Sequence, residues 1–280
     1  MKNRFYPVIL LLLSFSAKGQ FYYNDILGTQ KTMTLWKQYK KNTIHSISAK
    51  SFESDGQESK DFLLEQDIDL SKKIIETKSG AVSAASSNLS SYFNEKDQLI
   101  KTVDVNDISE NTVIYTYNEA GQLTVMETNA VTQDNSFSQN EKHVWFYNSE
   151  GKPEKMLKIK NEKDTVTVRI NYDDKGNASE EVSFARGRQI ERFYFYYNEK
   201  NQMTDIVRYN NRYQKMLPDY SFDYDNNGRL SDMTVYRVQS SGSDYLTWRY
   251  LYDARGLKTK EGCFDKDNKL VGKIEYTYNQ

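Results

Sequence analysis

The sequence has one cysteine, two histidines and three prolines among its 280 residues. Cys263 therefore cannot form a disulfide within the chain, and His45 and His143 are too far along the sequence to mark it as a paired nucleophile. We expect Cys263 to be a packed apolar residue. The sequence also has no zinc-ligand spacing, nucleophile elbow, phosphate-binding loop or dinucleotide fingerprint. It predicts no enzyme and no cofactor.

An excess of positive charge is also missing, since the chain has 38 basic and 39 acidic residues. Removal of residues 1–19 would take away Lys2, Arg4 and Lys18 and leave 35 basic residues against 39 acidic ones. Such a balance gives no electrostatic footprint for nucleic acid. No apolar run after residue 19 is long enough for a spanning helix, so we expect no transmembrane span in the mature chain.

The first 19 residues have the three parts of a secretory signal peptide. Lys2 and Arg4 precede an apolar core at residues 8–13, and Ala17 and Gly19 are the small residues before a cut at Gln20. A membrane anchor is the alternative, but the polar residues from Lys18 onward end the apolar run too early. No cysteine follows the core to carry a lipid. We expect a protein exported by a Gram-negative bacterium to the periplasm or the medium.

A seven-residue phrase then recurs along the chain. It begins with Tyr or Phe, continues with Asn or Asp, and has Gly in fifth place in most copies. The copies cover residues 93–99, 117–123, 147–153, 172–178, 197–203, 224–230 and 252–258, and Tyr278-Asn279-Gln280 begins an eighth. Asn and Asp open turns, and Gly supplies a positive φ. Where Gly is missing, Asp97 and Asn201 replace it, and both residue types tolerate the left-handed region. The phrase predicts a turn rather than a catalytic motif.

The residues before each turn alternate with period two, as in Val113-Tyr115-Tyr117 and Phe193-Phe195-Tyr197. This period and the 22 tyrosines are typical of strands. We predict an all-β fold in which tandem antiparallel β-hairpin repeats over residues 92–280 form a twisted meander sheet or an open half-barrel. The pattern leaves open whether the sheet closes.

The phrase resembles the YD repeat of Rhs and teneurin proteins, and Tyr224 to Leu230 is the closest match. The resemblance covers residues 93–280. It implies strand-turn-strand units. The long members of that family form an enclosing shell around a C-terminal domain, and we do not carry that function over to a chain with so few repeats.

Residues 20–91 are expected to form an N-terminal part of the molecule. Residues 24–41 predict one helix, capped by Asn24 or Asp25 and covering an end of the sheet. His45 to Asp69 predicts a divergent hairpin, and the small polar residues 79–91 predict a loop or linker.

One turn also resembles a metal site. Asp223 to Leu230 matches the opening of an EF-hand loop, but Thr234 stands where a bidentate Glu is needed. Because the turn explains all copies and calcium only one, we predict no metal ligands.

A binding site is expected where the copies differ. The candidates are the connections Asn129–Glu141 and Val238–Asp244, and the alternate strand face with Phe146, Tyr194 and Tyr196, although burial is the commoner role for such rings. The sequence thus predicts an exported, non-enzymatic protein whose sheet binds protein or glycan at the cell envelope. A carbohydrate-active or cell-wall hydrolase and a structural spacer remain alternatives.

Overall fold

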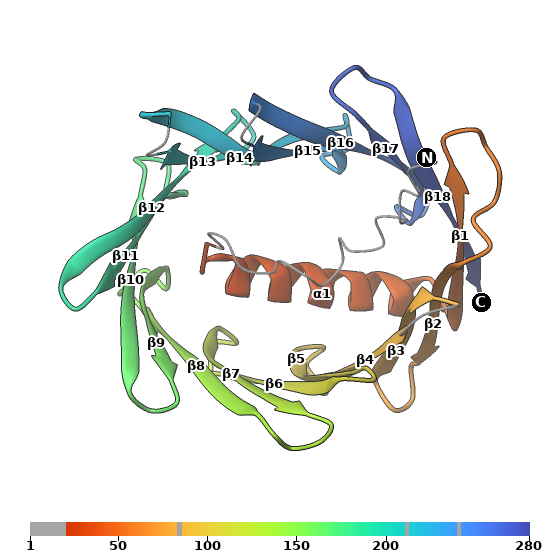
Figure 1. Ribbon diagram of the computed structural model, residues 1–280. Helices are drawn as coiled ribbons and strands as arrows, with labels where there is room; N and C mark the ends of the chain where they lie inside the picture. The colour runs from red at the N-terminus through yellow and green to blue at the C-terminus, as the bar shows by residue number, and fades with distance from the viewer. Residues whose placement is uncertain (1–20, 83–85, 211–212, 240–241) are drawn as a thin grey trace.

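The computed structural model describes residues 21–82, 86–210, 213–239 and 242–280, and the predicted signal peptide lies outside these residues. One helix, α1, spans Asn24–Lys41, and eighteen strands follow it (Figure 1). The first nine strands are β1 (Ser46–Glu53), β2 (Phe62–Asp69), β3 (Ile74–Ala81), β4 (Ser86–Phe93), β5 (Leu99–Val105), β6 (Ser109–Tyr117), β7 (Leu123–Thr132), β8 (Ser138–Tyr147) and β9 (Pro153–Lys160). The other nine are β10 (Asp164–Tyr172), β11 (Ala178–Ala185), β12 (Arg188–Tyr197), β13 (Met203–Asn210), β14 (Lys215–Tyr224), β15 (Leu230–Gln239), β16 (Gly242–Tyr252), β17 (Lys258–Phe264) and β18 (Leu270–Asn279).

The strands form one closed antiparallel barrel. Each strand pairs with its sequence neighbours, and β1 also pairs with β18 from Ser46 opposite Asn279 to Glu53 opposite Gly272. The prediction of an all-β hairpin meander is confirmed, whereas the open half-barrel is wrong. β18, which leads into the incomplete eighth copy, pairs with β1 along the full length of β1. Neither strand is therefore left as an unpaired edge of the sheet.

The repeated phrase forms the predicted turns along one rim of the barrel. In a typical copy, Gly121 donates its N–H to the carbonyl of Asn118, and the Asn118 side chain accepts from the Gln122 N–H. Gly121 has a φ of 78°, and Asp97 and Asn201 have φ values of 59° and 57° at the same position. The prediction that Asp97 and Asn201 replace Gly at a position that needs a positive φ is confirmed.

The tyrosine of the phrase links neighbouring repeats. Its hydroxyl donates to the carbonyl of the last residue in the preceding copy, as from Tyr147 to Leu123 at 2.7 Å and from Tyr252 to Leu230 at 2.8 Å. The same bond is made by Tyr117, Tyr172, Tyr224 and Tyr278. Six tyrosines thus fix their part of the rim to the preceding turn, and Tyr197 is the exception among the described residues.

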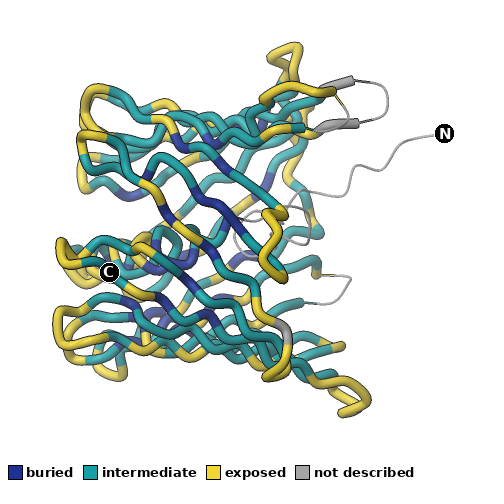
Figure 2. Tube along the Cα trace, turned by 90° about the vertical axis from the view of Figure 1, so that its left-hand side faces the viewer, coloured by how far each residue is buried: buried dark blue, intermediate teal, exposed yellow. Residues whose placement is uncertain are grey.

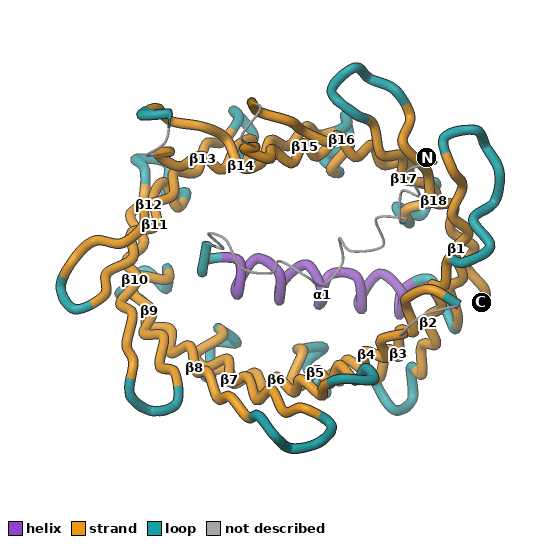
Figure 3. Tube along the Cα trace, viewed as in Figure 1, coloured by secondary structure: helices purple, strands orange, loops and turns teal. Residues whose placement is uncertain are grey.

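Helix α1 has the predicted limits but a different location. It lies inside the barrel rather than over an end of the sheet (Figures 1 and 3). Its backbone lies near that of β5. The expected side-chain cap is also wrong, because Tyr23 precedes the helix without a capping bond and Asp25 contacts the barrel wall instead.

Strands replace the linker that the small polar residues 79–91 predicted. β3 and β4 pair from Ile74 opposite Tyr92 to Gly80 opposite Ser86, and β4 continues the sheet into β5. The sheet thus runs without a break between the N-terminal part and the repeats. The predicted hairpin from His45 to Asp69 is confirmed as β1 and β2.

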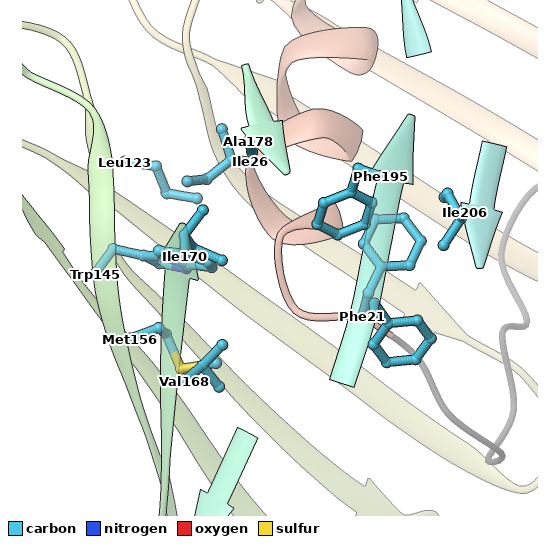
Figure 4. Packing of buried hydrophobic residues seen from close by; sticks show 11 residues of the cluster. Phe21, Ile26, Leu123, Trp145, Met156, Val168, Ile170, Ala178, Phe195 and Ile206 are labelled. Carbon is cyan, nitrogen blue, oxygen red and sulfur yellow. The ribbon is translucent and has the colours of Figure 1, made fainter. Parts of the chain in front are cut away.

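The core occupies the barrel interior, and exposed residues gather at the two rims (Figure 2). One cluster surrounds the start of α1 and contains Phe21, Ile26, Trp145, Phe193 and Phe195 among others (Figure 4). A second cluster surrounds Trp36 and Tyr39 of α1, where Trp36 stacks on Phe93 at 4.6 Å between ring centroids. Among the described residues, no helix is long and apolar enough to cross a membrane.

Candidate functional site

The two faces of the barrel wall carry different residues because successive side chains of a strand point to opposite sides. The Tyr-containing rows point inward, and Trp145, Phe193 and Ile170 are almost fully buried there. The alternate rows, with Phe146 and Tyr196, point outward. The predicted variable face is therefore the outer wall of the barrel.

A buried polar network fixes the start of α1 to the inner wall. The Asp25 carboxylate lies 2.7 Å from His143 Nδ1 and accepts a hydrogen bond from Trp145 Nε1 at 3.1 Å. Asp25 and His143 are both almost completely buried. His143 Nε2 lies 3.1 Å from Glu141, which also pairs with Lys158 at 2.9 Å.

These contacts decide the charge of His143. Burial alone would lower the pKa of His143, but the hydrogen bonds with Asp25 and Glu141 outweigh it and raise the pKa to about 9. The bond from His143, together with Lys158, lowers the pKa of Glu141 to about 2. The network therefore holds an imidazolium between two carboxylates at neutral pH.

Glu181 of β11 holds the residues just before the helix. Its carboxyl oxygens accept hydrogen bonds from the backbone N–H groups of Tyr22 and Tyr23, at 2.8 and 2.6 Å. Glu181 is completely buried, and burial raises its pKa to about 8. Because all of these groups bind one another across α1 and the wall, we assign the network to docking of the helix.

The outer wall carries many charged side chains within its strands. Arg249 pairs with Asp232 at 3.1 Å, and Lys273 and Lys260 both pair with Glu275. A lipid-facing barrel wall has an apolar band, and an Arg or Lys at its midplane costs about 2–4 kcal/mol. This outer wall has the charge pattern of a water-facing surface instead.

One row of this wall crosses five neighbouring strands, β8 to β12. The residues directly opposite one another are Phe146, Lys155, Arg169, Val182 and Arg192, and we call them the outer row. Lys155 and Arg169 are thus like charges on paired positions, an arrangement that destabilises a sheet. Neither has an ion-pair partner among the described residues. Arg192 approaches Glu180 at 3.5 Å.

Aromatic rings lie beneath these cations. Lys155 Nζ lies 4.9 Å from the centre of the Phe146 ring, and Arg169 lies 5.5 Å from that of Phe184. Val182, although on the outer wall, is only 4% exposed. Phe146 remains 42% exposed. Tyr196, also on the outer wall, is 50% exposed but lies four residues along β12 from Arg192. The outer row is therefore a packed, cationic and aromatic surface that still faces solvent.

The other predicted candidates lie apart from this row. Asp225 of the calcium-like turn pairs with Arg229 at 2.7 Å and accepts the turn N–H groups, so its oxygens serve the turn. Cys263 is buried on the inner wall, and burial raises the pKa of its thiol to about 11. Residues 129–141 form parts of β7 and β8 joined by a tight turn, and the predicted connection Val238–Asp244 falls partly outside the described residues.

The sequence did not indicate the helix-docking network. It indicated Phe146 on the outer face, but not the cations Lys155 and Arg169 that lie beside it in the outer row. His143 and Asp25 are 118 residues apart, and no local spacing links them. The outer row could have been found only by aligning the repeat copies, which places Phe146 and Lys155 on facing strands.

No family model and no curated protein matches the sequence. Solved structures with similarity include a porin-like protein from Bacteroides uniformis, at 10% identity and a TM-score of 0.39, over 84% of this chain and 98% of that one. A porin-like protein from Bacteroides vulgatus follows at 12% identity and a TM-score of 0.29, with the same coverage. The complex TcdB2-TccC3-TEV matches at 11% identity and a TM-score of 0.31, over 78% of this chain, which spans 15% of that chain. These scores leave the function to be argued from the residues.

Proposed function

We propose that this chain is an exported, non-enzymatic binding protein whose outer row recognises an acidic polysaccharide. The observation that carries the proposal is the pair of directly opposite cations, Lys155 and Arg169, left without ion-pair partners among the described residues, with the exposed Phe146 ring beside Lys155. An unrelieved like-charge pair costs stability, and a carboxylate-bearing ligand would remove that cost. The exposed Phe146 ring beside Lys155 offers a flat apolar face to a sugar ring.

The proposal includes the location and the repeat type. The residues before Gln20 support export, and the charged outer wall supports a water-filled location such as the periplasm or the medium rather than a bilayer. The bond from six of the turn tyrosines to the preceding copy supports a short YD-type repeat protein that forms a barrel without an enclosed domain.

An array of acidic and neutral polysaccharides, read for both binding and hydrolysis, tests this function. We expect the protein to bind acidic polymers without cleaving them. The variant K155Q/R169Q should lose at least tenfold in affinity, because both unpaired cations are removed. Raising the salt concentration should weaken binding by the wild type, since exposed charges are screened.

The matched control is K260Q on the opposite part of the outer wall, where the lysine is already paired with Glu275. It should bind as the wild type does. Equal affinity of K155Q/R169Q and the wild type, or binding of neutral and acidic polymers alike, contradicts the assignment to the outer row. Turnover of any polymer contradicts the non-enzymatic part and favours a wall-active hydrolase.

A further inference from the structure

The two rims of the barrel differ in their exposed residues. The turns of the repeated phrase form one rim, on the side of the C-terminus (left in Figure 2), and among the described residues no large hydrophobic side chain is exposed within those turns. We call the opposite rim the far rim. Its hairpins have exposed hydrophobic side chains at or beside their tips, namely Ile108, Phe137, Ile190, Tyr209 and Met216. Exposed apolar residues gathered on one surface indicate an interaction site.

The charges of the far rim are separated around the barrel, and one part is acidic. The tips of the β5–β6 and β7–β8 hairpins, residues 104–110 and 131–138, contain acidic residues and no basic residue. Asp107 and Asp134 are exposed there. Neither carboxylate has an ion-pair partner in the described part of the chain.

The tips of the β11–β12 and β13–β14 hairpins carry the opposite charge. Residues 185–190 and 209–216 contain basic residues and no acidic residue. Arg186, Arg188 and Lys215 are exposed, and none of them forms an ion pair with another described residue. The far rim therefore has an acidic and a basic part, each with exposed apolar residues.

The β9–β10 hairpin lies midway between these two parts. Successive hairpins are two strands apart, which is about 10 Å along the rim. The β7–β8 and β11–β12 tips are thus equally far from the β9–β10 tip, and so are the β5–β6 and β13–β14 tips. A twofold axis through the β9–β10 tip, perpendicular to the barrel axis, places each acidic tip of one copy opposite a basic tip of another. Glu162 and Lys163, both exposed at the tip on this axis, also complement each other across it.

We propose that the far rim is the contact surface between two copies of this chain in a symmetric, rim-to-rim dimer. Asp134 of one copy faces Arg186 and Arg188 of the second copy, and Asp107 faces Lys215. Each of these contacts occurs twice, because the same surface is used on both copies. Complementary charges of this kind set the orientation of a contact.

The exposed apolar side chains gain burial in the same dimer. Phe137 is 56% exposed and lies on the tip that faces Ile190, and Ile108, which is 72% exposed, lies on the tip that faces Met216. Because only hairpin tips meet, the contact is small, and we expect a dimer that dissociates on dilution. The outer row on β8 to β12 stays free, on the same side in both copies.

Sedimentation velocity of the chain processed at Gln20, over a range of concentrations, tests the dimer. We expect a monomer–dimer equilibrium that added salt shifts toward the monomer, since exposed charges are screened. The variants R186E/K215E and D107K/D134K should each weaken self-association at least tenfold, because each brings like charges together at two tips. An equimolar mixture of the two variants should associate again, because each reversed residue then meets the opposite charge. Both variants should unfold at the wild-type midpoint, since all four positions are exposed.

The variant F137S tests the apolar part of the contact without a change of charge. It should weaken self-association several-fold and leave the stability of the monomer unchanged, because Phe137 is already exposed there. The matched control is K175E/K200E, which reverses two exposed lysines in the turns of the other rim. It should associate as the wild type does.

A wild type that stays monomeric at every concentration overturns the proposal. Sedimentation of that monomer with vesicles of phosphatidylglycerol and phosphatidylethanolamine would assign the far rim to a lipid surface instead. Equal weakening by K175E/K200E, or a mixture of the two charge-reversed variants that does not associate, also overturns the dimer. The outer-row variant K155Q/R169Q should associate as the wild type does, so the dimer and polysaccharide binding succeed or fail separately.

Discussion

At the scale of single residues, the tyrosine of the repeat has a role beyond packing. Tyr147 is only half-buried, yet its hydroxyl donates to the Leu123 carbonyl one repeat earlier. The bond ties two turns that are not otherwise joined by the chain at that rim. Fixing a turn in this way requires a hydroxyl at the ring's end. Tyr stands first in six full copies and makes this bond in five of them, and Phe93 stands first in the copy that has no preceding copy to bond.

Replacing Tyr147 by Phe should therefore destabilise the barrel. The ring remains, but the Leu123 carbonyl loses its donor, and the expected cost is about 1–2 kcal/mol. Denaturant unfolding measures the change. Tyr196 is 50% exposed on the outer wall, and Tyr196→Phe should leave stability within experimental error. Equal midpoints for both variants would show that the hydroxyl bond contributes nothing.

At the scale of elements, the limits of α1 were predictable and its location was not. The charges and spacing of residues 24–41 are local, and they were sufficient to predict the range Asn24–Lys41, although the expected cap by Asn24 or Asp25 does not form. The partner of the helix depends on His143 and Glu181, more than a hundred residues later. An interior helix needs contacts on several sides, so its residues show no strong single apolar face.

The strands of residues 79–91 were missed for a related reason. Ser and small residues at these positions have low strand preference, but Ser91 and Thr77 face inward next to the second core cluster. Small inward side chains leave room for Trp36 and Tyr39 of α1. The composition that suggested a linker thus suits a wall that accommodates a helix.

The docking of α1 should weaken as pH rises. The pKa of His143 is raised to about 9 in the folded protein from 6.5, so the stability from its imidazolium is complete below pH 6.5 and is lost as pH approaches 9. Glu181, raised to about 8 from 4.5, changes in the same direction, because the folded state favours its protonated form. The loss from His143 is on the order of 3 kcal/mol.

Denaturant unfolding between pH 6 and 9.5 measures this dependence for the wild type and for H143Q. Glutamine keeps hydrogen-bonding groups without a titrating proton, so H143Q should be less stable at pH 6 and show a shallower decline between pH 6.5 and 9. Parallel curves for the two proteins would mean that His143 is not held as an imidazolium by Asp25 and Glu141.

At the scale of the whole molecule, the seam between β1 and β18 decides between a barrel and an open sheet. Local patterns predict hairpins but carry no information on whether the first strand meets the last one. In the structure Ser48 lies directly opposite Thr277 on the outer wall. A pair of cysteines at these two positions should therefore crosslink within one molecule, either directly on oxidation or through a short bifunctional thiol reagent.

The crosslinked S48C/T277C protein should migrate as a monomer of altered mobility and resist unfolding by up to about 5 kcal/mol more than its reduced form, because the link joins distant parts of the unfolded chain. In the comparison pair S48C/T259C, Thr259 lies on β17, which does not pair with β1. That pair should react far more slowly. Equal crosslinking of both pairs, or of neither, would mean that the seam is open in solution. The outer row on β8 to β12 does not include the seam and would remain.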